Sequence, residues 1–401
     1  MHQHAKSSLG CALFFYSLFL ALTTRFVLVI KVSTNKCRVL GRENNHRGRN
    51  AVKNLGFFSK KNAGVGLDLG SEWLKMVKIR PGKGDMVLES MARCPWQPGD
   101  LDSSSATAKK INGLWSELQL KEQVVVSSMA GHAVIVKRVV FEAESAKAIG
   151  DTVMKDARQY IPFDINDVFL DYQVLGPGQK DKSYDVLLVA SKKKVVQNLS
   201  DVISQSGLSL SVIDVDSFAL CNSFEHNYPE FQEKPVYLLD IGGAQSVFCI
   251  YHNGQPSFLR EVSFGGRAVT ESLASILNIK RLDAERIKLS GKEDLGDKDL
   301  RSISDAVNKI FKNWCDELRR LIGFYHSSSS NVTPAESLYL SGGGALLGGL
   351  RDVFQKELNL EVHYHNPFRK IHVDNNTFQK EYLDEIGPQM VVPFGLALRA
   401  I

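Results

Sequence analysis

The sequence predicts an α/β fold that contains an internal duplication. Three observations lead to this prediction. Strand and helix patterns alternate from Gly64 onward. The strand order of residues 63–93 recurs in residues 235–263. A glycine turn follows the first strand of both segments, so we expect an internal duplication.

The first block of the chain predicts three strands followed by a helix and a fourth strand. Short apolar runs bounded by turn residues predict the strands. The helix is predicted by Leu114, Trp115 and Leu118, which fall on one face. The expected elements are strands Ala63–Asp68, Trp73–Ile79 and Met86–Arg93, helix Ala106–Leu120 and strand Val124–Ser127.

Two further blocks follow, of which the later one restarts the first pattern. The middle block predicts strand His132–Phe141, helix Ala143–Tyr160, strands Val168–Leu175 and Tyr184–Ala190, and helix Lys192–Ser206. The last block predicts strands Pro235–Asp240, Ser246–Tyr251 and Gln255–Ser263, helices over Ala268–Phe324, a linker Ser327–Ser330, and a strand, glycine turn and helix within Ser337–Leu358. The Asn253-Gly254 pair is typical of a hairpin turn.

Composition limits the class of protein. A chain of 401 residues with 44% hydrophobic and 23% charged residues is typical of a soluble protein of two or three domains, which excludes a disordered chain and a multi-span membrane protein. The net charge is +5, but residues 1–53 alone carry +8. The basic charge therefore gives no indication of a nucleic-acid-binding body. Six scattered cysteines without a CxxC pair predict neither a zinc site nor a disulfide framework, and fit a reducing compartment.

Residues 1–54 form an extension with two interpretations. The apolar run 9–30 has about the length that crosses a bilayer as a helix, and the basic residues from Arg25 to Lys53 would hold the rest of the chain in the cytoplasm. Alternatively, the extension lies upstream of a true start near Val52. A cleaved signal peptide is disfavoured, because residues 23–25 lack a small-x-small site.

Two predicted strands end in an aspartate followed by a glycine turn. A glycine turn lets backbone N–H groups point at an anion, and the aspartate can hold a magnesium-bound water. One such hairpin is as easily a purely structural turn, whereas two that face each other predict a site that grips a phosphate chain from both sides. The residues expected at this site are Asp68, Gly70, Ser71, Lys75, Asp240, Gly242, Gly243 and Ala244, with Asp68 and Asp240 holding magnesium through water.

A third glycine loop and a charged pair complete the candidate site. Gly342, Gly343 and Gly344 remove every Cβ from a turn between a strand and a helix, so a flat group can lie against bare backbone. Glu285 and Lys288 lie three residues apart on one helical face. Taken alone, the loop predicts a tight connection and the pair a solvated ion pair; together with the hairpins, the pair is expected to hold ribose hydroxyls.

These motifs resemble those of the actin, Hsp70 and sugar-kinase superfamily, in its FtsA- and MreB-like branch, and the chain in particular resembles the PilM family of bacterial type IV pilus assembly proteins. The superfamily's phosphate hairpins match residues 68–75 and 240–246, its adenosine loop matches 341–344, and its ribose-contacting residues match Glu285 and Lys288. Segments similar to the PilM family are 55–61, 160–163, 170–175, 207–208, Asp214, 218–220, 366–368 and 395–399. The resemblance covers residues 55–401.

The resemblance implies a duplicated ribonuclease-H-type fold of the actin and Hsp70 kind, with a nucleotide cleft between the two halves and a subdomain inserted into the first half. Its first half would comprise residues 55–131, 213–234 and 370–401, and its second half residues 235–369, with a helical subdomain at 268–330. The inserted subdomain would be residues 132–212, beside which a partner groove is expected; its contact residues are not identified.

The resemblance also implies a function in pilus biogenesis and twitching motility. The expected protein is cytoplasmic and peripheral at the inner membrane, binds ATP and Mg²⁺, and docks the N-terminal cytoplasmic tail of PilN. Other inner-membrane pilus components are expected partners, membrane association is expected mainly through these partners, and no nucleic acid is expected. No residue is identified as catalytic, so at most weak ATPase activity is expected.

Two alternatives remain at this point. An FtsA-like filament-forming protein would end in a basic amphipathic helix, which residues 398–401 do not resemble. A small-molecule kinase of the same fold would need an acceptor pocket with a positioned aspartate, and no residue indicates one. Glu72 and Trp73 depart from the small residues that relatives carry after the first aspartate. An acid at this place is expected to weaken phosphate binding unless it points away.

Overall fold

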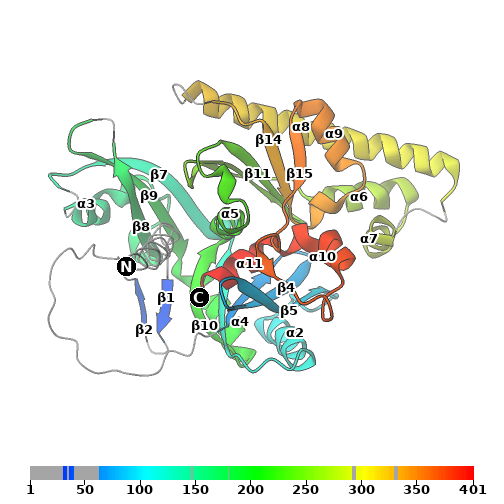
Figure 1. Ribbon diagram of the computed structural model, residues 1–401, viewed down its shortest axis with the longest axis horizontal. Coiled ribbons are helices and arrows are strands. Elements are labelled where there is room, and N and C mark those ends of the chain that lie inside the picture. Colours follow the sequence, from blue (N-terminus) through cyan, green and yellow to red (C-terminus); the bar gives the residue numbers. More distant parts are fainter. Residues whose placement is uncertain are drawn as a thin grey trace, which may run out of the picture. The chain divides into compact units, whose positions relative to one another are not determined.

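The computed structural model describes residues 30–33, 36–39, 63–145, 148–178, 180–290, 295–328 and 333–401 (Figure 1). The chain divides into two compact units. We call residues 134–194 the inserted unit, with which residues 30–33 and 36–39 are grouped, and the other described residues the main body.

The first half of the main body is built on a mixed sheet. Its strands are β3 (Gly64–Leu69), β4 (Trp73–Pro81), β5 (Met86–Pro95), β6 (Val124–Met129), β10 (Ser209–Val215) and β16 (Ile371–His372). They lie in the order β16-β5-β4-β3-β6-β10. β3, β4 and β5 pair antiparallel, whereas β6 runs parallel to β3 and β10 parallel to β6.

The second half repeats this order. Its strands are β11 (Val236–Ile241), β12 (Ser246–His252), β13 (Gln255–Val262), β14 (Ser337–Ser341) and β15 (Glu361–Tyr364). They lie in the order β13-β12-β11-β14-β15, with β11 to β13 antiparallel and with β14 and β15 parallel to β11. In both halves, three antiparallel strands are followed by two parallel strands beside the first. The predicted duplication is therefore confirmed.

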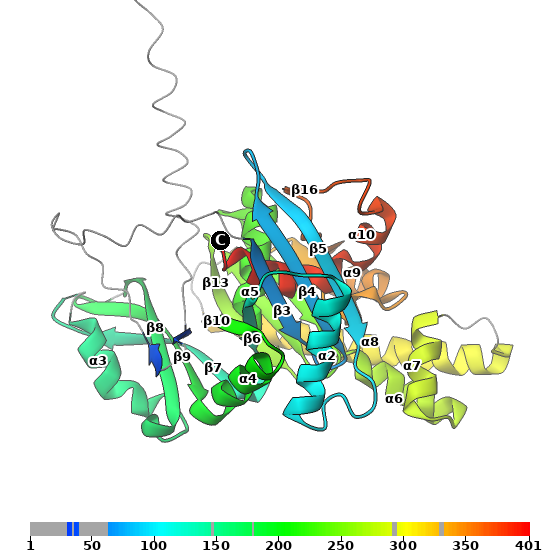
Figure 2. The same cartoon turned by 90° about the horizontal axis from the view of Figure 1, so that it is seen from below.

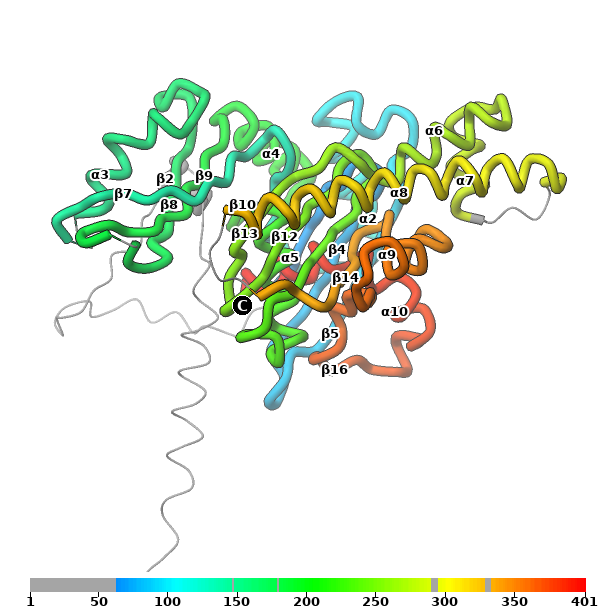
Figure 3. Tube along the Cα trace, turned by 90° about the horizontal axis from the view of Figure 1, so that it is seen from above, coloured from blue at the N-terminus to red at the C-terminus, as the bar shows by residue number. Residues whose placement is uncertain are grey.

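Helices cover the faces of both sheets. Those of the main body are α2 (Ser104–Glu117), α4 (Lys193–Gln205), α5 (Asp216–Asn227), α6 (Gly266–Leu277), α7 (Arg281–Ser290), α8 (Asp297–Ser328), α9 (Leu350–Leu358), α10 (Lys380–Ile386) and α11 (Val391–Leu398). Figure 2 shows α2 in front of β3 to β5 and α11 behind them. In Figure 3, α8 runs along the outside of the second half, with α6 and α7 beside one of its ends.

The spacing of buried residues explains why these helices form. α2 begins at Ser103, whose hydroxyl accepts the backbone N–H of Ala106 at 3.2 Å, a common helix start. The long α8 buries a side chain about every third or fourth position, the period of a helix packed along one stripe: Phe311, Trp314, Cys315, Leu318, Leu321 and Tyr325. α8 extends along this stripe to Ser328. The predicted start of the linker at residues 327–330 is therefore wrong, because Ser327 and Ser328 are still helical.

α11 packs against the elements that carry the candidate site. A Cβ on Gly66 of β3 would lie 2.0 Å from the carbonyl oxygen of Pro393, and one on Gly395 would lie 1.9 Å from that of Ala219 in α5. Both glycines therefore allow backbones to touch. Phe394 lies between the two contact residues of α11, Pro393 and Gly395. Its side chain is fully buried and joins the core of the first half. β3 and α5 are thus fixed through one helix.

The inserted unit is a three-stranded sheet with one helix. Its elements are β7 (Val134–Glu142), α3 (Ile149–Asp156), β8 (Val168–Pro177) and β9 (Ser183–Lys192), and β9 pairs antiparallel with both β7 and β8. It has its own core, which includes Val153, Val186 and Leu188. The expected range 132–212 is too long, because β10 pairs with β6 in the main sheet. The helix expected over 143–160 is shortened to α3 and a following 3-10 turn.

Little of the N-terminal extension falls within the described residues. β1 (Ile30–Ser33) and β2 (Lys36–Val39) pair antiparallel. The rest of the apolar run 9–30, the alternative start near Val52 and the motif 55–61 lie outside the described residues. Among the residues that the structure describes, no helix has the length and apolar character needed to span a bilayer.

Candidate functional site

The first hairpin places an aspartate opposite a lysine. Asp68 in β3 is paired with Lys75 in β4, so their side chains share one face of the sheet and form an ion pair. Asp68 is only 4% exposed. Burial lowers the pKa of the Lys75 ammonium, but the carboxylates of Asp68 and Asp240 outweigh burial and raise the pKa above its usual value. Lys75 therefore remains charged at the base of the turn.

The second hairpin brings another aspartate to the same lysine. Asp240 lies near the end of β11, and its carboxylate accepts the hydroxyl of Ser341 at 2.9 Å. Burial raises its pKa, while the Lys75 charge and the Ser341 hydrogen bond oppose that rise. The turn is closed by the backbone of Gly242, which donates to Gln245 at 3.1 Å. The two predicted hairpins thus meet around Lys75.

A third carboxylate, Asp216, completes the group and was not predicted. It is the first residue of α5, directly after β10, and accepts the hydroxyl of Ser128 at 2.5 Å. Burial and the nearby Asp68 raise the pKa of Asp216 to about 7. One feature of the sequence could have pointed to Asp216: it is an aspartate at the carboxyl end of a parallel strand. Asp240 likewise lies at the carboxyl end of β11. Asp214, two residues earlier, has a different role: it forms a buried ion pair with Arg399, at 2.7 Å.

This pKa has a measurable consequence for stability. An unfolded aspartate has a pKa of about 3.9, so unfolding releases a proton from Asp216 between about pH 4 and 7. Stability is therefore lost as pH rises through that window. We expect Asp216→Asn to raise the melting temperature of the nucleotide- and metal-free protein at pH 8, and to raise it less at pH 5. The exposed Asp352→Asn is the control. A difference between Asp216→Asn and wild type that does not change with pH would contradict this assignment.

The third glycine loop packs against the second hairpin. Gly342 has φ +80°, and a Cβ there would lie 2.4 Å from the carbonyl oxygen of Ile241. A Cβ on Gly344 would lie 2.3 Å from the Ile241 side chain, and one on Gly343 would lie 3.1 Å from the amide of Gln389. Close packing thus accounts for all three glycines. The helix after the loop begins only at Leu350.

Glu285 and Lys288 do not form a solvated surface pair. Both lie on α7, 2.7 Å apart, with side chains 23% and 11% exposed. Thr270 of α6 binds both side chains, and Lys288 also donates to the carbonyl oxygen of Gly266 at 3.3 Å. A Cβ on Gly266 would lie 3.9 Å from the Cα of Gly344. The pair is therefore held at the start of α6, beside the glycine loop.

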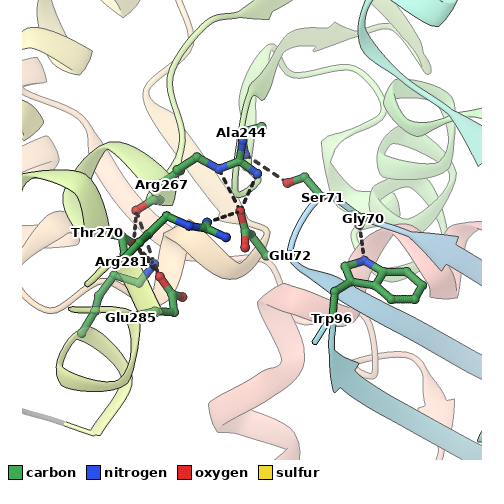
Figure 4. A network of polar contacts seen from close by, with 11 residues as sticks. Gly70, Ser71, Glu72, Trp96, Ala244, Arg267, Thr270, Arg281 and Glu285 are labelled. Carbon is green, nitrogen blue, oxygen red and sulfur yellow. Dashed lines mark hydrogen bonds and ion pairs between the residues drawn. The ribbon is translucent and has the colours of Figure 1, made fainter. Parts of the chain in front are cut away.

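Aromatic residues hold the first turn in place. The indole N–H of Trp96 donates to the carbonyl oxygen of Gly70 at 2.7 Å (Figure 4). The backbone N–H of Trp96 donates to the carbonyl oxygen of Glu72 at 3.0 Å. Trp73 lies under the guanidinium of Arg93, 5.2 Å from the ring centre, and Arg93 also donates to Gln389. The bulky Trp73 therefore packs beside Arg93 within the first half.

Comparison with known proteins identifies the family. The family model described as type IV pilus assembly protein PilM matches residues 66–401. The chain belongs to the PilM family. A solved structure described as a PilM-PilN type IV pilus biogenesis complex is similar with a TM-score of 0.75 and 29% identity, over 85% of this chain and 99% of that chain.

More distant relatives agree with an actin-like fold. The ethanolamine utilization protein EutJ of Carboxydothermus hydrogenoformans has a TM-score of 0.52 and 15% identity, over 84% of this PilM-family chain and 89% of that chain. Cell division protein FtsA of Enterococcus hirae is 22% identical over 174 residues, which is 41% of this chain and 39% of that protein. The chain thus spans less than half the length of this curated relative. The broader PilM match favours the pilus interpretation over the FtsA-like alternative.

Proposed function

We propose that this chain is an actin-like, ATP-binding component of type IV pilus assembly that docks the N-terminal cytoplasmic tail of PilN. Family membership and the similarity to a PilM-PilN complex support the pilus role. The observation that carries the nucleotide role is the group of three carboxylates around the Lys75 ammonium, between two glycine turns. Through PilN and other inner-membrane components, the protein would be held at the cytoplasmic side of the inner membrane.

The main body offers complementary groups to each part of magnesium-ATP. The Lys75 ammonium suits the phosphates, and so does the Ala244 N–H once it is released from Ser71. Among the described residues, no three His, Cys, Asp or Glu side chains lie close enough to share a metal ion, so Asp68 and Asp240 would hold Mg²⁺ through water. The metal would supply positive charge to the phosphates. Glu285 and Lys288 suit the ribose, and the loop at 342–344, which lies beside Gly266, is the proposed neighbour of the base.

Asp216 gives this site a candidate proton acceptor. A carboxylate with a pKa of about 7 can take a proton from a water molecule near neutral pH. The same pKa leaves much of Asp216 protonated at that pH, and Ser128 engages one of its oxygens. We therefore propose that hydrolysis is slow and that ATP acts mainly as a state setter, by binding one arrangement of the two halves more tightly than another.

The inserted unit is the proposed neighbour of the PilN tail. It has its own hydrophobic core, so it is a rigid element on which a peptide can be held. We expect calorimetry to detect binding of a synthetic PilN N-terminal peptide to the full chain. Hydrogen exchange should then show protection in residues 134–194 and none in α8, which is the internal control. Binding without protection in the inserted unit would contradict this placement.

A further inference from the structure

The turns of the two hairpins touch each other directly. The hydroxyl of Ser71 accepts the backbone N–H of Ala244 at 3.1 Å, so the tip of the first half contacts the tip of the second. A Cβ on Gly243 would lie 2.3 Å from the Glu72 side chain. This contact closes the cleft at the residues assigned to the phosphates.

An ion pair spans the same contact (Figure 4). Glu72 of the first half accepts two hydrogen bonds from Arg267 in the first turn of α6, at 2.9 and 2.6 Å. Arg281, the first residue of α7, lies 3.6 Å from the same carboxylate oxygen. One carboxylate therefore faces two guanidinium groups that belong to the other half and offsets one of their two positive charges.

The place of this ion pair sets up a competition. Glu72 follows Ser71 directly, and α6 begins beside Gly242 and Gly243, whose carbonyl oxygens accept the N–H groups of Gly266 and Arg267. A polyphosphate between the turns would be repelled by Glu72 and attracted by Arg267 and Arg281. Guanidinium groups bind phosphate and carboxylate with the same bidentate geometry, so phosphate can replace Glu72 as their partner.

We propose that Glu72 is an exchangeable latch: its carboxylate holds the two hairpin turns together through Arg267 and Arg281 until a polyphosphate takes over these arginines. The inference rests on the proposed ATP site and adds a residue that sets its affinity. Glu72 thereby lowers the affinity for nucleotide and keeps the empty cleft closed. Glu72 is then a regulator of this site.

The latch predicts opposite effects for its two ends. Glu72→Gln keeps the shape of the side chain but frees two positive charges beside the phosphates, so magnesium-ATP should bind about 10-fold tighter, a gain of about 1.4 kcal/mol. Arg267→Gln leaves less positive charge to offset Glu72, so binding should weaken by a similar factor. A purely structural role would weaken binding in both variants. Because these side chains are partly exposed, both effects should shrink as salt is raised.

The test combines two readouts on the full-length chain. Hydrogen exchange without nucleotide reports latch opening at residues 242–245, and calorimetry with magnesium-ATP reports affinity. Glu89→Gln is the matched control, because Glu89 also accepts an arginine at 2.6 Å, from Arg80, on the strands of the first half. We expect Glu72→Gln alone to show faster exchange and tighter binding. Unchanged exchange, or an affinity equal to that of wild type, would overturn the latch.

The same experiment separates the latch from the proposed ATP site. If Glu72→Gln speeds exchange but neither protein binds magnesium-ATP, the ATP assignment and the displacement by phosphate are both wrong, and only the closing contact stands. If wild type and Glu72→Gln bind equally well with equal exchange, the ATP assignment stands and the latch is wrong.

Discussion

Gly395→Ala should lower the free energy of unfolding by about 3 kcal/mol or more. The added Cβ would lie 1.9 Å from the carbonyl oxygen of Ala219, which is backbone and cannot rotate away. α11 must then move away from α5, and this movement disturbs the packing of α11 against β3. Urea unfolding followed by circular dichroism measures the change. Because β3 carries Asp68 and α5 begins at Asp216, the folded variant should also bind nucleotide more weakly.

Gly323→Ala is the matched control for this prediction. Gly323 also lies inside a helix, α8. Apart from its chain neighbours and the nearby backbone of α8, no atom lies within 4 Å of the position of an added Cβ. Alanine is the better helix former, so this variant should gain about 0.5 to 1 kcal/mol. If both variants change stability in the same direction, the close contact between α11 and α5 is wrong.

Asp240→Asn should reduce the affinity for magnesium-ATP by about 100-fold, or about 2.7 kcal/mol. The asparagine keeps the shape of the side chain and can still accept the Ser341 hydroxyl. It removes the charge that would hold water on Mg²⁺ and that faces Lys75. Calorimetry at fixed magnesium measures the loss.

Two comparisons make the Asp240 result specific. Asp352→Asn, an exposed change on α9, should bind nucleotide as wild type does. The melting temperature of Asp240→Asn should not fall, because neutralising a carboxylate whose pKa is raised by burial removes a cost of folding. An unchanged affinity would show that the second hairpin is not a phosphate site.

The sequence predicts the hairpins well because their signals are local. An apolar strand, an aspartate and a glycine lie within a few residues at 68–70 and at 240–242, and the period of two then places Lys75 opposite Asp68. The duplication follows from comparing two such segments. The predicted residues of the glycine loop and of α7 also come together, through Gly266 and Thr270.

Features that depend on pairing between distant strands could not be predicted in this way. Asp216 joins the site only because β10 pairs with β6. The same pairing explains why residues 195–212, which the sequence places in the inserted subdomain, belong to the main body. Glu72 points across to Arg267, 195 positions later in the chain, and no local pattern connects these two residues. In both cases the missing information is which segments are neighbours in space.

The central claim is that nucleotide held by the main body controls docking of the PilN tail. The most direct measurement is the affinity of the full-length chain for a PilN N-terminal peptide with and without saturating magnesium-ATP, with phosphate release followed in the same samples. We expect peptide affinity to change with nucleotide in wild type but not in Asp240→Asn, and release to stay well below about 1 per second. Peptide affinity indifferent to nucleotide, together with release at about 1 per second or faster, would contradict the account and favour an enzymatic role.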